Sequence, residues 1–109
     1  MTEPLCRIQD LADPGSKGLE VELDGVRTEI FIVRRGQAVY AYRNSCPHTG
    51  GPLDWKPDEY LDGDGEYIMC ATHAALFQIE DGLCIGGPCK RQHLTPVPLR
   101  VEGDAVYLA

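Results

Sequence analysis

Two short segments of the sequence each carry one cysteine and one histidine at the spacing of metal ligands. They are Cys46-Pro47-His48 and Cys70-Ala71-Thr72-His73, and 21 residues separate them. Two thiolates and two imidazoles suffice for a tetrahedral zinc site, but zinc fingers usually place both cysteines in one arm and both histidines in the other. Here each arm mixes the two types. If the cysteines bind one metal and the histidines another, each segment bridges two metals, as in a dinuclear iron-sulfur centre.

Three further cysteines and one histidine stand outside these segments. Cys84 and Cys89 are close enough in sequence to form a local disulfide, although reduced packing residues are favoured in a reducing compartment. Cys6 lies in an expected early strand and is assigned a packing role. His93 has no second ligand at metal-binding spacing, which favours a surface or core role.

The segments that must position these residues are short and rich in β-branched and aromatic side chains. They are separated by Gly, Pro or Asp, and none has a sustained period near 3.6, so the sequence predicts an all-β fold. The expected strands are residues 28–34, 37–43, 66–70, 75–79, 83–85, 97–102 and 105–108. Arg35-Gly36 and Gly103-Asp104 are expected hairpin turns, and the last strand is expected to pair back into the first sheet. The proline-containing stretches 13–15 and 95–98 are typical of turns or strand edges.

The length of 109 residues favours one domain, 1–109, with an inserted lobe at about 45–95 that holds four of the five cysteines and all three histidines. The excess of acidic over basic residues, a formal net charge of -7, argues against sequence-independent nucleic-acid binding. The first 15 residues lack the features of a secretory signal, and no run approaches the roughly 20 apolar residues of a membrane span. We therefore expect a cytoplasmic chain without a membrane partner.

The two ligand segments and their surroundings resemble the Rieske iron-sulfur family. Residues 46–53 (CPHTGGPL) are similar to the first cluster loop of Rieske ferredoxins, and residues 70–77 (CATHAALF) are similar to the second. Gly86-Gly87-Pro88 stands where the family has a proline-bearing third loop, and residues 96–108 match its terminal hairpin. The resemblance extends from about residue 37 to the C-terminus.

This resemblance implies a fold, a cofactor and a set of ligands. The implied fold is an antiparallel β-sandwich with a small inserted cluster-binding lobe, and the implied cofactor is one 2Fe-2S cluster per chain. By correspondence with the family, Cys46 and Cys70 hold the buried iron, while His48 and His73 hold the outer iron.

The chain also departs from the high-potential members of the family. Respiratory Rieske proteins join the two loops by a disulfide, but this sequence has Gly51 and Thr72 at the two cysteine positions. Ala75 and Phe77 stand where those proteins have a serine and a tyrosine hydroxyl near the cluster sulfurs. Because such donors stabilise the added negative charge, their absence predicts a low, dioxygenase-ferredoxin-like potential near the low end of the Rieske range, about -150 mV.

The ligand residues favour a one-electron carrier, and the resemblance to Rieske ferredoxins implies that it passes electrons from a flavin-dependent reductase to an oxygenase. Beyond the four candidate ligands only His93 remains, so a 2-His-1-carboxylate oxygenase centre cannot be assembled and the chain is not expected to be an enzyme by itself. One alternative is a small Rieske subunit of a larger, nitrite-reductase-like oxidoreductase. Another is a structural zinc-binding interaction module.

An acidic segment lies between the two ligand pairs. Residues 54–66 contain six carboxylates and one lysine, a local charge of -5. The segment lacks the full ligand register of a calcium loop, and a solvated turn is the favoured interpretation. Its place between the cluster loops makes it a candidate docking patch for a basic partner protein.

Overall fold

The computed structural model describes residues 4–45, 53, 60–62, 65–70, 75–87 and 92–109. Its elements, in chain order, are β1 (Cys6–Arg7), the 3-10 helix η1 (Ile8–Asp10), β2 (Gly15–Leu23), β3 (Val26–Arg35), β4 (Ala38–Arg43), β5 (Tyr67–Cys70), β6 (Ala75–Gln78), β7 (Cys84–Gly86), β8 (Leu99–Glu102) and β9 (Ala105–Leu108). The strands form three antiparallel sheets of order β1-β9-β8, β2-β3-β4 and β5-β6-β7. The all-β prediction is confirmed. No helix within the described residues has the length and apolar character needed to cross a membrane.

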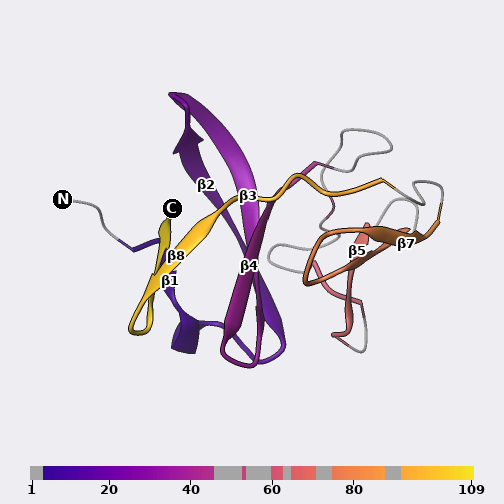
Figure 1. Ribbon diagram of the computed structural model, residues 1–109, viewed down its shortest axis with the longest axis horizontal. Coiled ribbons are helices and arrows are strands. Elements are labelled where there is room, and N and C mark those ends of the chain that lie inside the picture. The colour runs from indigo at the N-terminus through magenta and orange to yellow at the C-terminus, as the bar shows by residue number, and fades with distance from the viewer. Residues whose placement is uncertain (1–3, 46–52, 54–59, 63–64, 71–74, 88–91) are drawn as a thin grey trace.

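The central sheet β2-β3-β4 lies between the other two sheets (Figure 1), and its middle strand β3 is buried on both faces. Ile30 and Ile32 of β3 pack into one core with residues of the terminal sheet β1-β9-β8, such as Val106. Phe31 and Val33 belong to a second core with residues of the β5-β6-β7 sheet. Successive side chains on a strand point to opposite faces, so a strand covered on both sides is apolar without interruption. This explains the run of four apolar residues in β3, none more than 1% exposed.

The C-terminal hairpin forms its own layer, contrary to the expectation that its last strand joins the first sheet. β9 pairs with β1 and β8, with Cys6 opposite Val106. The chain meets the central sheet just before β8, where Arg43 N donates to Thr95 O at 2.9 Å and Val97 N donates to Ala41 O at 2.8 Å. Prolines 96 and 98 cannot donate to a strand ladder, so this stretch contacts the edge of β4 only briefly before it enters the other sheet. The prediction of a strand edge here is confirmed.

Two details of the central sheet also differ from the sequence prediction. β2 was not predicted, although Leu19, Val21 and Leu23 alternate with glutamates at the period of a half-buried strand. The β3-β4 turn consists of Gly36-Gln37 rather than Arg35-Gly36, because Arg35 pairs with Ala38. Gly36 has φ +64°, a conformation that glycine adopts without steric cost, so the glycine sits at the first turn position.

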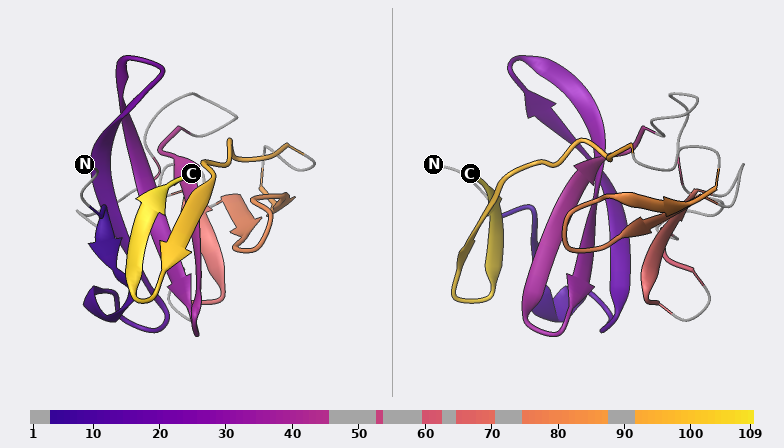
Figure 2. Two further views of the ribbon diagram at one scale, coloured as in Figure 1. Left: turned by 60° about the vertical axis from the view of Figure 1, so that its left-hand side comes forward. Right: turned by 45° about the vertical axis from the view of Figure 1, so that its right-hand side comes forward.

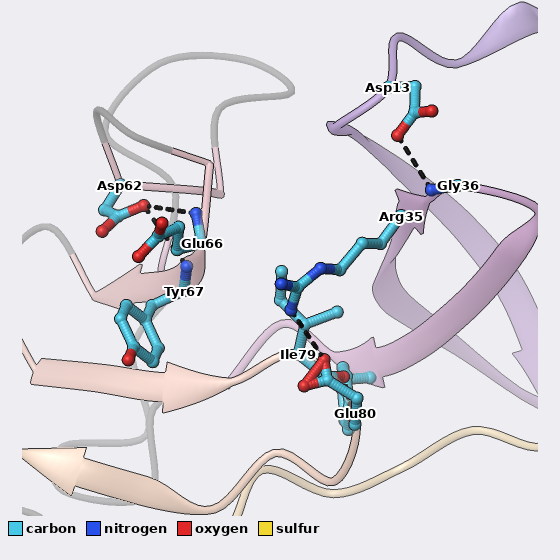
Figure 3. Close-up of polar contacts among 9 residues, drawn as sticks. Asp13, Arg35, Gly36, Asp62, Glu66, Tyr67, Ile79 and Glu80 are labelled. Carbon is cyan, nitrogen blue, oxygen red and sulfur yellow. Dashed lines mark hydrogen bonds and ion pairs between the residues drawn. The ribbon is translucent and has the colours of Figure 1, made fainter.

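The β5-β6-β7 sheet and the terminal sheet lie on opposite sides of the central sheet (Figure 2). A hydrogen bond joins the β6-β7 turn to the central sheet. The Tyr42 hydroxyl of β4 donates to Ile79 O at 2.6 Å. Burial raises the pKa of Tyr42, which keeps this hydroxyl protonated as a donor. At the surface, Arg35 pairs with Glu80 at 3.0 Å (Figure 3), an exposed contact that contributes at most about 1 kcal/mol.

Candidate metal centre

The structure describes one of the four predicted ligands. Cys70 is the last residue of β5 and is fully buried. Cys46, His48 and His73 lie outside the described residues, so the ligand assignment stays a prediction. Within the described part of the chain, no three His, Cys, Asp or Glu side chains come together as a metal site.

The β5-β6 hairpin gives the second ligand segment a rigid base. Cys70 pairs with Ala75 at the end of the ladder, and Ile68 pairs with Phe77 two residues further along. All four side chains are fully buried and lie on one face of the hairpin, in the core shared with β3. The Cys70 side chain therefore comes from a packed strand, and the connection 71–74 that contains His73 starts and ends on paired residues.

The segment after β7 packs directly against that base. Gly87 has φ +91°, and a Cβ atom on it would lie 2.8 Å from the Cα atom of Ala75, so only glycine fits without displacing the backbone. A bulge precedes this approach, since Gly86 pairs with Leu76 but Cys84 pairs with Phe77. The Cys84 thiol, which is 2% exposed, donates to Gly86 O at 3.1 Å across the bulge. Gly87 thus covers Ala75, the first described residue after the second ligand segment.

The first ligand segment is held where it begins and ends. Leu53, the last residue of the predicted first loop, is fully buried, and its N-H donates to Asn44 Oδ1 at 2.8 Å. Asn44 follows β4 directly and donates its own N-H to Glu29 O of β3 at 2.9 Å. Sequence analysis missed Asn44, although its place two residues before Cys46 was a usable signal.

The structure also places the other residues singled out in the sequence. Cys6 is buried between the central and terminal sheets, and burial raises the pKa of its thiol, which confirms its packing role. His93 is exposed, and its backbone forms an isolated antiparallel β-bridge with Leu83, so its surface role is confirmed. Cys89 lies outside the described residues, and its pairing with Cys84 stays untested.

Part of the acidic segment is described, around Asp62. Its Oδ1 accepts hydrogen bonds from Glu66 N at 3.0 Å and Tyr67 N at 3.3 Å (Figure 3). This carboxylate therefore stabilises its own turn, as an Asp at a loop start commonly does. Most of the other carboxylates of the segment lie outside the described residues.

Comparison with known proteins identifies the class. The family model of the Rieske [2Fe-2S] domain matches residues 2–101. The chain therefore belongs to the Rieske [2Fe-2S] domain family, and its cofactor is a 2Fe-2S cluster. A comparison with curated protein sequences found no match.

Solved structures show the same fold. The ferredoxin of carbazole 1,9a-dioxygenase from Nocardioides aromaticivorans IC177 is 24% identical with a TM-score of 0.72, over 99% of this chain and 98% of that one. The Sphingomonas yanoikuyae B1 ferredoxin is 20% identical with a TM-score of 0.70, over 99% and 97%. A chain of the complex of reduced oxygenase and oxidized ferredoxin in carbazole 1,9a-dioxygenase is 24% identical with a TM-score of 0.72, over 97% and 99%.

The residues present fit a 2Fe-2S cluster. The sequence supplies two cysteines and two histidines in two segments, which is the donor set of a Rieske centre. Cys70 comes from a water-excluded strand end, as expected for a thiolate on the buried iron. Ala75 and Gly87 bring no polar side chain to this end of the lobe.

The fully buried Ala75 offers a test of the low-potential prediction. By correspondence with high-potential Rieske proteins, Ala75→Ser adds a hydroxyl donor near a cluster sulfur. A donor there stabilises the reduced, more negative state of the cluster. The midpoint potential should therefore rise from about -150 mV by about 60 mV, which is a tenfold change in the equilibrium constant for one-electron reduction. Protein-film voltammetry measures both values. A wild-type midpoint well above zero, or an unchanged midpoint in Ala75→Ser, would contradict this explanation.

Proposed function

We propose that this chain is a one-electron carrier that passes electrons from a flavin-dependent reductase to a terminal oxygenase. In this proposal Cys46 and Cys70 hold the buried iron and His48 and His73 hold the outer iron. The observation that carries it is the Rieske family match over residues 2–101, joined to a buried Cys70 at the end of a packed hairpin. The matched ferredoxins, one of them in complex with an oxygenase, have nearly the same length as this chain and support the choice of partner. We place the exchange in the cytoplasm, where thiols remain reduced.

The ligand set suits easy acceptance of one electron. The bound cluster supplies the redox chemistry by changing charge by one unit. Two thiolates balance the dication of two ferric ions and two sulfides, so the oxidised centre is neutral and the reduced centre carries one negative charge. Four thiolates would leave more negative charge to accommodate after reduction. The imidazole ligands therefore raise the potential above that of an all-cysteine centre.

The chain itself is proposed to have no catalytic step. Of its three histidines two are assigned to the cluster, and the third, His93, is exposed beside Leu83. A mononuclear iron site with two histidines and a carboxylate therefore cannot be built from this sequence. The substrate chemistry then belongs to the oxygenase that receives the electron.

Electron paramagnetic resonance tests the proposal directly. Protein produced anaerobically with ample iron should be red-brown, and its dithionite-reduced form should give a Rieske spectrum. A flavin-dependent reductase should then reduce it, and the reduced protein should be reoxidised by an oxygenase. Colourless, zinc-containing protein would overturn the proposal. Native extract in which the chain migrates only within a large complex would favour the alternative of a subunit in a nitrite-reductase-like assembly.

Charge reversal tests the acidic segment as a docking patch. Asp58 and Glu59 lie outside the described residues, between the two ligand segments. If a basic partner docks there, Asp58→Lys with Glu59→Lys should slow second-order reduction about tenfold at low salt, since electrostatic steering contributes at least this much. The effect should fade as salt rises. Glu22→Lys with Glu102→Lys makes the same change of charge at exposed sites in β2 and β8 and serves as the control. Equal rates in both variants would remove the docking patch.

A further inference from the structure

Asn44 joins the two ends of the first ligand segment. Its Oδ1 accepts from Leu53 N at 2.8 Å, and its backbone N-H is bonded to Glu29 O of β3. Residues 44 and 53 lie on either side of Cys46 and His48. Asn44 thus binds Leu53 through its side chain and the central sheet through its backbone.

Tyr60 extends this connection to the second ligand segment. Its hydroxyl accepts from Asn44 Nδ2 at 3.5 Å, and its carbonyl oxygen accepts from Met69 N at 2.9 Å. Met69 directly precedes Cys70 in β5. Tyr60 therefore contacts Asn44 through its side chain and the cysteine-bearing strand through its backbone.

The Tyr60 side chain is held in place by the central sheet. It is 4% exposed and stacks on the Phe31 ring, with ring centroids 4.4 Å apart and planes 8° apart. Its backbone N-H donates to Ser16 Oγ of β2 at 3.2 Å. The hydroxyl occupies space left by Gly18, because a Cβ atom on Gly18 would collide with it. With the ring stacked on Phe31, the hydroxyl cannot move away at low cost.

We infer that Asn44 and Tyr60 are positioning residues that hold the two cluster-ligand segments at a set separation. This inference rests on the proposed function. The pair joins Leu53, which ends the first segment, to Met69, which precedes the ligand of the second. Residues that orient metal ligands contribute about 10–100-fold to metal affinity, although they do not touch the metal.

Three variants separate the two contacts. Asn44→Ala removes both, and we expect the cluster to be lost to a chelator about tenfold faster. Amide hydrogen exchange at Leu53 should accelerate in the same variant, because its N-H loses the acceptor. Asn44→Asp keeps an acceptor for Leu53 N-H, so exchange at Leu53 should return to the wild-type rate. Tyr60→Phe keeps the stacking and removes the hydroxyl, so it should accelerate cluster loss while leaving Leu53 protected.

The pair predicts a non-additive double variant. If Asn44 and Tyr60 act together, Asn44→Ala with Tyr60→Phe should lose its cluster no faster than Asn44→Ala alone. Gly18→Ala, on β2, places a Cβ atom against the Tyr60 hydroxyl, so it should accelerate cluster loss at least as much as Tyr60→Phe. Gln37→Ala, which truncates an exposed amide in the β3-β4 turn, serves as the control.

The outcomes distinguish this inference from the proposed function. Wild-type protein that holds a Rieske cluster, with wild-type cluster loss in Tyr60→Phe and Gly18→Ala, would overturn the positioning role and leave the carrier function intact. Fully additive effects would overturn the coupling of the two residues. If Asn44→Ala does not fold, Asn44→Asp, Tyr60→Phe and Gly18→Ala still decide the matter. Wild-type protein without iron would instead overturn the proposed function, and the positioning role with it.

Discussion

Purified Cys70→Ala protein is expected to contain no 2Fe-2S cluster. Cys70 is fully buried at the end of β5, so bulk water does not reach the position of its thiolate to replace it. The proposed set would then retain one thiolate on the buried iron, too few to hold a cluster that needs two on that atom. Iron analysis and the visible spectrum should both fall to the level of protein without a cluster.

Cys6→Ala is the matched control for this loss. Cys6 is also buried, but it lies between the central and terminal sheets, on the opposite side of β3 from Cys70. Its truncation removes a small apolar group and should cost about 1 kcal/mol of stability while iron content remains that of the wild type. Full iron and colour in Cys70→Ala would show that Cys70 is not a ligand.

Phe31→Ala is expected to cause a large loss of stability. Phe31 is fully buried where the central sheet meets the β5-β6-β7 sheet. It stacks on Tyr60 and lies 5.9 Å from the Tyr42 ring, centroid to centroid. Truncation leaves a cavity between two β-sheets and should lower the free energy of unfolding by about 3–5 kcal/mol. Urea unfolding followed by fluorescence measures the change.

Two further variants serve as controls for the effect of Phe31→Ala on stability. Val26→Ala changes a residue of the same strand that is 63% exposed, and should shift stability by less than about 0.5 kcal/mol. Phe31→Leu should recover part of the loss because it refills some of the cavity. If Phe31→Ala costs no more than Val26→Ala, the two sheets do not depend on this contact.

Local patterns predicted most of the strands and missed the features that depend on partners in space. The expected turn Gly103-Asp104 lies between the paired strands β8 and β9, and Gly103 has positive φ. β2 was missed because two glycines and a lysine precede its alternating half, and β3 stabilises it along its whole length. The partners of β9 could not be predicted, because β1 is only two residues long. Such a short strand has no periodic signal of its own.

For the candidate site, too, local sequence predicted some features and only the tertiary structure decided the others. The ligand types and their spacing are local, so Cys46-Pro47-His48 and Cys70-Ala71-Thr72-His73 were sufficient to predict a metal centre. The resemblance of the surrounding loops to Rieske loops then predicted the 2Fe-2S cluster and the family, which the family match confirms. An all-β fold was equally readable, because strand and turn preferences act over a few residues. The layering of the sheets and the meeting of Gly18, Phe31, Asn44 and Tyr60 were decided only by the tertiary structure. These residues come from separate segments, and contacts between distant segments depend on how sheets pack rather than on any local pattern.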